Sequence, residues 1–327
     1  AFFRSSGGVN VDLVYVRDDQ PGIRRQRRGR GFSYVAPDGT TIARGAERAR
    51  LEALAVPPAY EDVWMCALSN GHLQATGRDA RARKQYRYHE KWAEAQARTK
   101  FDSLTGFAHN LPRLRARVAR DLEQEAGERD FALACAVTLI DRTSLRVGHP
   151  EYTDQNGSYG ALTLRRRHVT LSDDGIALRY VAKGGKKVRR QVKDRTLSRV
   201  LHKIGDLPGA EVLTWLDDDG TPHMLSSQAL NAYIAEGADE EGITAKTFRT
   251  WAGTVAAFEI GEKGSATIKD MAEAAAARLA NTPTVARNSY IHPDVVELAG
   301  TEALSGFDAG RAGLRAAENR LLAYLER

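Results

Sequence analysis

The pattern of apolar residues changes near residue 90, and this change constrains the fold more than any other feature of the chain. Before it, short runs such as Val11–Val16, which is rich in β-branched and aromatic residues, and the pair Val63–Leu68 and His72–Thr76 on either side of a turn signal are typical of strands. After it, apolar residues recur at three- and four-residue intervals, as in Phe131–Leu145, which is typical of helices. The predicted fold is therefore α+β. It has a small β-rich N-terminal domain over residues 1–90 and a larger, mainly α-helical domain over residues 91–327, which contains a small β insertion.

Turn signals delimit the strands predicted in the N-terminal domain. Val11–Val16 is predicted to be one strand, and Pro37-Asp38-Gly39 is predicted to separate the strands Phe32–Ala36 and Thr40–Ile42. Asn70-Gly71 follows Val63–Leu68 and predicts a tight hairpin, because these two residue types accept positive φ. Few helical periods occur in this region, so we expect strands to dominate it.

The second domain is predicted to be helical with one β insertion. Ala161–Leu171 and Ile176–Val192 carry the β pattern, and Gly184-Gly185 interrupts the second of these runs. Thr244 and Thr282 are expected N-caps, and Pro283 follows Thr282 at the first helical position. The helices predicted around the insertion are Leu111–Ala126, Phe131–Leu145, Leu197–Ile204, Ser227–Glu236, Thr244–Phe258, Ile268–Ala280, one beginning at Thr282-Pro283, and Ala309–Glu326.

Positive charge is concentrated in two segments of the N-terminal domain. The net charge is +6, which a solubilising surface alone would explain. Clustering of the cations instead favours a polyanion such as nucleic acid as the partner. The clusters are Arg24, Arg25, Arg27, Arg28 and Arg30, and then Arg78, Arg81, Arg83, Lys84 and Arg87.

Several classes of site are not supported by the residues. Cys66 and Cys135 are far apart, which predicts two reduced thiols in a cytosolic protein. Asp217–Gly220 fits a polar turn better than a calcium loop, because alignment on Gly220 puts Trp215 at the first ligand position. No HExxH motif, paired-Cys site or P-loop occurs, and no apolar run approaches the roughly 20 residues of a membrane span.

Four segments carry side chains suited to phosphoryl chemistry, although each alone has an ordinary structural explanation. Arg146 follows an apolar helix, where a C-terminal cation is common. Lys183 lies at a predicted hairpin tip, and Tyr290 follows the helix start at Thr282-Pro283, where a core tyrosine would be ordinary. Arg249 lies in the first turns of its helix, where the dipole disfavours a cation. That broken rule favours a functional role for Arg249.

In their order along the chain, which is Arg, Lys, Arg and Tyr, the four side chains resemble the catalytic set of type IB DNA topoisomerases, of the compact bacterial and poxvirus-like branch, and more loosely that of tyrosine recombinases. The resemblance extends from about Tyr15 to Ala299. It rests on the motifs Arg-x-Gly-x-x-x-Tyr, Lys-x-Phe-Arg-Thr-Trp and Thr-Pro-x-x-x-Arg-x-Ser-Tyr. The catalytic residues that it implies are Arg146, Lys183, Arg249, Asn281 and Tyr290.

One position departs from the family pattern. The family very often has His where this chain has Asn281. An asparagine keeps an amide donor for a phosphate oxygen, but it cannot carry a charge or shuttle a proton. We therefore expect Asn281 to orient and stabilise the phosphate rather than to titrate.

The resemblance also implies an activity and a partner. The expected enzyme relaxes supercoiled duplex DNA by transient single-strand cleavage through a 3′-phosphotyrosyl intermediate at Tyr290, followed by religation, with no ATP, metal or other cofactor. The expected protein is a bacterial, cytoplasmic, nucleoid-associated monomer that binds double-stranded DNA and no membrane. The segment Gly77–Tyr88 resembles the DNA-facing segment of the family, although its alternation would also suit a strand with one core face. The predicted DNA-binding residues are Arg83, Lys84, Gln85, Tyr86, Tyr88, Tyr152 and Lys246.

Two other functions remain open at this point. A tyrosine recombinase would share the nucleophile and both arginines, but its His-x-x-Arg motif would require histidine where Lys246 precedes Arg249. A non-catalytic DNA-binding or repair module would explain the charge and leave the ordered constellation unexplained.

Overall fold

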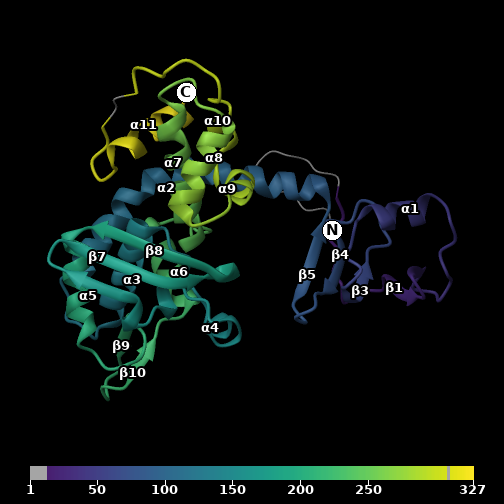
Figure 1. Cartoon of the computed structure of the whole chain (residues 1–327), viewed down its shortest axis with the longest axis horizontal. Coiled ribbons are helices and arrows are strands. Elements are labelled where there is room, and N and C mark those ends of the chain that lie inside the picture. Colours follow the sequence, from purple (N-terminus) through teal and green to yellow (C-terminus); the bar gives the residue numbers. More distant parts are fainter. Residues whose placement is uncertain (1–12, 308–309) are drawn as a thin grey trace. The chain divides into compact units, whose positions relative to one another are not determined.

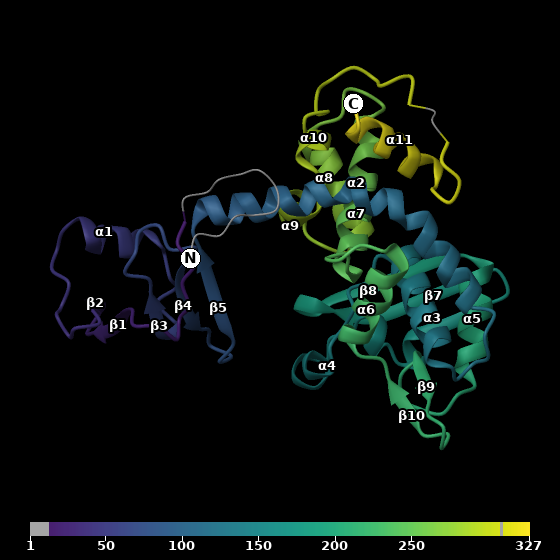
Figure 2. The same cartoon turned by 180° about the vertical axis from the view of Figure 1, so that it is seen from behind.

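The computed structural model describes residues 13–307 and 310–327, apart from the side chains of Tyr152 and Gln155. The chain divides into two compact units, Ala1–Lys100 and Phe101–Arg327 (Figures 1 and 2). Helix α2, Glu90–Asp121, begins where the apolar pattern changes and continues past the boundary between the units. A β-sheet in the first unit and mainly helices in the second confirm the predicted α+β class.

The first unit is built on a five-stranded antiparallel sheet in the order β2-β1-β3-β4-β5. Ile23, Val63 and Met65 form its core, against which helix α1, Ala46–Ala53, packs Leu51. The strands are β1 Ile23–Arg28, β2 Gly31–Val35, β3 Glu61–Met65, β4 Leu73–Arg78 and β5 Lys84–Tyr88.

Three predictions for this unit were wrong. Within Val11–Val16, residues 11 and 12 lie outside the described part of the chain, and the rest forms only an isolated bridge between Val14 and Gly71. The runs on either side of Asn70-Gly71 do pair antiparallel as β3 and β4, but neither residue of the turn has the predicted positive φ. A Cβ built on Gly71 would lie 2.5 Å from the Cys66 Sγ, so glycine is needed there for close packing. Thr40–Ile42 contributes a single bridge at Thr41, although the turn at Gly39 has the expected positive φ of 87°.

Helix α1 was not predicted from the sequence. Leu51 is its one buried residue, so its apolar face is too narrow to produce a helical period. Polar contacts also hold the helix to the sheet, because Arg50 donates to the Cys66 carbonyl at 2.8 Å and to Gln74 at 3.0 Å.

The second unit surrounds helix α3, which is buried at every position from Phe131 to Ile140 and packs against α5, α6 and α7. A three-stranded antiparallel sheet, β6-β7-β8, lies beside α5 (Figure 1). The helices are α3 Arg129–Thr143, α4 Pro150–Asn156, α5 Arg195–Gly205, α6 Ser227–Ala238, α7 Ala245–Gly261, α8 Ile268–Leu279, α9 Pro283–Tyr290, α10 Pro293–Val296 and α11 Ala316–Leu325. The strands are β6 Val169–Ser172, β7 Gly175–Ala182, β8 Lys186–Lys193, β9 Thr214–Leu216 and β10 Pro222–Met224.

The predicted helices of this unit are confirmed with two differences, and the β insertion with one. The helix expected from Leu111 is the C-terminal part of α2. The start of the helix expected over Ala309–Glu326 lies at a residue outside the described part of the chain, and α11 begins at Ala316. Ala161–Leu171 was predicted to be strand, but it forms two 3₁₀ turns before β6 because its backbone pairs with the segment that follows Arg146. The caps at Thr244 and Thr282 are confirmed, as is the polar turn at Asp217–Gly220 between β9 and β10. No helix in the described ranges is both long and apolar enough to cross a membrane.

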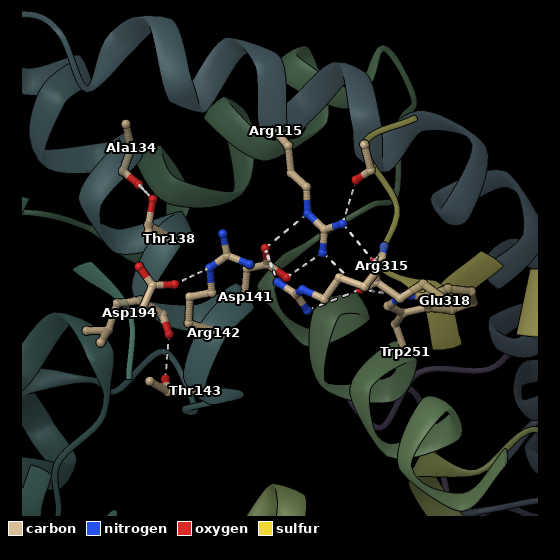
Figure 3. A network of polar contacts seen from close by, with 12 residues as sticks. Arg115, Ala134, Thr138, Asp141, Arg142, Thr143, Asp194, Trp251, Arg315 and Glu318 are labelled. Carbon is tan, nitrogen blue, oxygen red and sulfur yellow. Dashed lines mark hydrogen bonds and ion pairs between the residues drawn. The ribbon is translucent and has the colours of Figure 1, made fainter. Parts of the chain in front are cut away.

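A buried ionic network joins the C-terminal helix α11 to the interior of this unit (Figure 3). Arg115 of α2 donates to Asp141 of α3 at 2.9 Å and to Glu318 of α11 at 2.8 Å, and Arg315 contacts both carboxylates. Burial alone would raise the pKa of Glu318, but the two guanidinium groups outweigh it and hold that pKa below its ordinary value. The indole nitrogen of Trp251 in α7 also donates to the Glu318 carboxylate at 3.4 Å. The network therefore fixes α11 to α2, α3 and α7.

Candidate active site

Arg146 is placed by a backbone contact that requires glycine. The chain leaves α3 through Ser144, which has a left-handed φ of 56°. The Arg146 carbonyl then accepts from the Ala161 amide at 2.8 Å. A Cβ on Gly160 would lie 2.4 Å from the Gly148 nitrogen, and Gly148 itself has a φ of 85°. The glycine of the Arg-x-Gly motif thus allows the two segments to touch and holds the Arg146 backbone.

Arg249 is a buried cation that binds the carboxyl ends of two helices. It is only 4% exposed, and its guanidinium donates to the carbonyl of Ser144 after α3 and, at 3.1 Å, to that of Leu279 at the end of α8. Burial, followed by the nearby Arg146 charge, lowers the pKa of Arg249 to about 10. The negative ends of α3 and α8 compensate for its unfavourable place near the start of α7.

Asn281 follows α8 and points its carboxamide toward Arg146. Ala280 is left-handed, with a φ of 51°, and the Asn281 amide nitrogen donates to the Ala276 carbonyl at 3.0 Å. Arg146 donates to Asn281 Oδ1. The Asn281 Nδ2 and the Arg249 Nε are buried and have no hydrogen-bond partner among the described residues. Such unsatisfied donors are rare in folded proteins, and they fit a ligand that brings acceptor oxygens.

Tyr290 is the last residue of α9, which Thr282 caps through the Val285 amide and Pro283 starts. Its ring lies against Arg249, with 5.3 Å between the guanidinium carbon and the ring centroid. The Tyr290 side chain also hydrogen-bonds to Arg249 and partly offsets the loss of basicity that burial causes. The structure therefore brings together four predicted residues, Tyr290 with Arg249 and Arg146 with Asn281.

Lys183 lies at the tip of the β7–β8 hairpin, as predicted. It is exposed in a short 3₁₀ turn, where Gly184 and Gly185 have φ values of 79° and 76°. The hairpin is tied to the other site residues by Lys186, whose ammonium donates to the Asn281 carbonyl at 2.8 Å. Lys183 is thus carried on an element that contacts the site through a neighbouring lysine.

Arg190 is a site residue that the sequence analysis missed. It donates to the Thr143 carbonyl at the end of α3 and to the Arg278 carbonyl in α8 at 2.7 Å. Burial lowers the pKa of this arginine, as it does for Arg249. The signal was present in β8, where Arg190 takes a position in the inward alternation with Val188 and Val192.

A small cavity lies beside Arg146, Arg190 and Arg249. Three arginines and two tyrosines line it, and no carboxylate occurs among the described residues of its wall. Burial raises the pKa of the Tyr180 phenol despite the surrounding cations, so Tyr180 stays neutral. Within residues 13–307 and 310–327, no three His, Cys, Asp or Glu side chains gather in a way that could hold a metal ion. The charge of the wall suits an anion such as a phosphate. Its polar lining residues are Arg146, Arg190, Arg249, Tyr159, Tyr180, Thr143 and Ser144.

The DNA-binding candidates of the first unit lie on the edge strand β5 and the loop before it. Lys84, Tyr86 and Tyr88 alternate along β5 and are exposed, and the two tyrosine rings stack at 6.1 Å. Lys84 is held by Asp18 at 2.5 Å, which raises the pKa of the lysine. This pairing competes with a phosphate for the ammonium group.

Asp79 organises the loop before β5. It accepts from Arg83 and Gln85, and the hydrogen bond from Arg83 lowers the pKa of Asp79 to about 2. Among the candidates in the second unit, Lys246 is exposed in the first turn of α7. The Tyr152 side chain lies outside the described part of the structure.

The comparisons with known proteins agree on one family, the DNA topoisomerases I and IB. The model of the eukaryotic DNA topoisomerase I catalytic core matches residues 89–289, ending immediately before Tyr290. The model of the bacterial DNA topoisomerase IB N-terminal domain matches residues 31–79. The chain is 28% identical over 293 residues to a DNA topoisomerase 1B of Acanthamoeba polyphaga mimivirus, covering 85% of this chain and 87% of the relative. It is 25% identical over 255 residues to a DNA topoisomerase I of monkeypox virus, covering 73% and 76%.

Proposed function

Since this chain belongs to the type IB DNA topoisomerase family, we propose that it relaxes supercoiled duplex DNA by cutting one strand through a 3′-phosphotyrosyl bond at Tyr290 and then resealing it. The observation that carries this proposal is the contact of Tyr290 with the buried Arg249. Nearby, Arg146 and Asn281 form a pair in which the Asn281 Nδ2 is left for a phosphate oxygen.

In the cleavage step, the Tyr290 phenol oxygen attacks the phosphorus and the bond from phosphorus to the 5′-oxygen breaks. The phenol proton passes to water, and Lys183 gives a proton to the leaving 5′-oxygen. Arg146, Arg249 and the Asn281 amide hold the non-bridging oxygens, because guanidinium groups match phosphate geometry and stay charged. Loss of one such donor costs about 3–4 kcal/mol of transition-state stabilisation in comparable oxyanion sites.

Resealing reverses these steps and uses the energy kept in the phosphotyrosyl ester. A phenol is a better leaving group than a sugar hydroxyl, so the broken strand's 5′-hydroxyl displaces Tyr290 without ATP. The three arginines around the cavity supply the positive charge that a metal ion supplies in other phosphoryl-transfer enzymes. We therefore propose that catalysis needs neither a nucleotide nor a metal.

Duplex DNA is the proposed substrate, bound by a single chain. In the first unit, the exposed Lys84, Tyr86 and Tyr88 offer the cation and hydroxyl donors that phosphate contacts use, with Arg83 and Gln85 beside them. In the second, Lys246 and Tyr152 are the proposed contacts. The match to a bacterial N-terminal domain supports a bacterial protein that works on the nucleoid.

Plasmid relaxation in the presence of a chelator and without nucleotide tests this function. The wild type should convert negatively supercoiled plasmid to relaxed circles. Joined or inverted products from two DNA sites would favour a tyrosine recombinase instead. Slower migration of the DNA on a gel, with no change in linking number, would indicate a non-catalytic DNA-binding module. A complete requirement for a divalent cation would overturn the proposed mechanism. Moderate stimulation of relaxation by the cation would not, because cations also act on DNA binding.

A further inference from the structure

The backbone of Tyr290 lies directly against helix α7. A Cβ built on Gly253 would lie 2.7 Å from the Tyr290 carbonyl oxygen and 3.0 Å from the Tyr290 Cβ. Real Cβ atoms essentially never approach backbone atoms so closely, so only glycine fits without a shift of α9. Gly253 is also one helical turn after Arg249, so both residues lie on the same face of α7.

The next residue, Thr254, holds the chain on both sides of Ile291. It is 0% exposed, and its hydroxyl accepts from the His292 amide at 3.2 Å. The hydroxyl proton is shared between the Thr250 carbonyl at 2.9 Å and the Tyr290 carbonyl at 3.2 Å. One buried hydroxyl therefore joins the end of α9 and the start of α10 to α7.

We propose that Gly253 and Thr254 are positioning residues that set Tyr290 at its distance from Arg249. Helix α7 then carries both the cation that contacts the Tyr290 ring and the pair that holds the Tyr290 backbone. The phenol and the guanidinium keep one geometry because a single helix presents them to each other. The proposal rests on Tyr290 being the nucleophile, and it adds that α7 determines where the phenol oxygen stands.

A variant that displaces Tyr290 from this position should lose cleavage rate without losing DNA affinity. Displacement of a reacting group by about 1 Å can cost about 10²-fold in rate. Thr254→Val keeps the shape of the side chain and removes the hydroxyl, so it should slow single-turnover cleavage by roughly 10- to 100-fold. Thr254→Ser keeps the hydroxyl and should restore most of the rate.

Matched controls separate positioning from stability. Thr138→Val removes another buried hydroxyl, one that donates to the Ala134 carbonyl within α3 at 2.8 Å. Gly253→Ala places a methyl group against Tyr290, whereas Gly261→Ala, in the same helix, meets the side chains of Leu298 and Met271 at 3.1 Å. The controls should cleave at the wild-type rate even where their melting temperatures fall as far as those of the test variants.

The experiment measures covalent adduct formation on a duplex whose cleaved fragment dissociates, together with the dissociation constant and the melting temperature of each variant. We expect slow adduct formation in Thr254→Val and Gly253→Ala, unchanged affinity, and wild-type rates in Thr254→Ser and both controls. The defect should persist on a substrate with sulfur at the bridging 5′ position, because the proton donor is not what these variants lack. Wild-type rates in folded Thr254→Val and Gly253→Ala, or equal defects in the controls, would overturn the inference. If the wild type itself formed no adduct, the proposed function would fail instead.

Discussion

The guanidinium of Arg249 lies 5.3 Å from the centre of the Tyr290 ring, and its two terminal nitrogens donate to the carbonyls of Ser144 and Leu279. Arg249 therefore joins the carboxyl ends of α3 and α8 to the candidate nucleophile. It does so while buried and beside a second cation, Arg146, which lowers its pKa further. A bound phosphate would supply the negative charge that this pair of cations lacks.

Arg249→Lys should therefore be nearly as damaging as Arg249→Ala. A lysine ammonium is a point charge, and it cannot reach two carbonyls and a phosphate with the geometry of a guanidinium. We expect cleavage to fall by about 10²–10³-fold in both variants, the usual effect of losing one oxyanion donor. Single-turnover adduct formation is the measurement. A lysine variant within a few-fold of wild type would show that charge alone is sufficient.

Lys183→Ala should slow cleavage by about 10²–10⁴-fold if Lys183 is the general acid. A thiolate leaves without protonation, so a duplex with sulfur at the bridging 5′ position should be cleaved by Lys183→Ala nearly as fast as by the wild type. Arg249→Ala is the control and should stay slow on that substrate, because its oxygen contacts are still needed. Failure of sulfur to rescue Lys183→Ala would remove the general-acid role and transfer it to Arg146 or water.

Asn281→Asp tests the buried amide donor. The variant has the same shape and keeps an acceptor for Arg146, but it replaces Nδ2 with a charged oxygen facing the phosphate. We expect at least about 10²-fold slower cleavage. Asn281→His, which keeps an N–H donor, should retain most of the rate. Equal activity of the aspartate variant and the wild type would show that Nδ2 does not contact the substrate.

Glu318→Gln should destabilise the second unit in a pH-dependent way. The variant leaves Arg115 and Arg315 without one of their two carboxylates, and breaking such a buried ion pair costs about 3–5 kcal/mol. The folded pKa of Glu318 lies below the ordinary value of 4.5, so the wild-type advantage is full above pH 4.5 and is lost as pH falls through the folded value. Urea unfolding at several pH values measures the difference. A difference that grew in acid would contradict this assignment.

Local sequence signals predicted much of the fold, and the family resemblance supplied the proposed catalytic residues. The Thr282-Pro283 cap located α9, and the Gly184-Gly185 pair located the hairpin tip that carries Lys183. A cation near a helix start breaks a local rule at Arg249, which favoured a function there before the resemblance implied one, and the structure shows the two carbonyls that this cation binds.

The contacts that were missed depend on tertiary packing. Arg190 and Lys186 reach carbonyls distant in sequence, which no local pattern encodes. Asn70-Gly71 has the composition of a tight hairpin, yet Gly71 is required there by the Cys66 sulfur rather than by its φ. Tertiary packing decided each of these cases over local preference.

Tyr290 is the residue proposed to form the covalent bond to DNA. The most direct measurement digests the trapped protein–DNA adduct and identifies the modified peptide by mass spectrometry, with Tyr290→Phe treated in parallel. We predict a 3′-phosphate ester on Tyr290 in the wild type, and in Tyr290→Phe a folded protein that binds duplex DNA and forms no adduct. An adduct on another residue, or one that persists in Tyr290→Phe, would contradict the account.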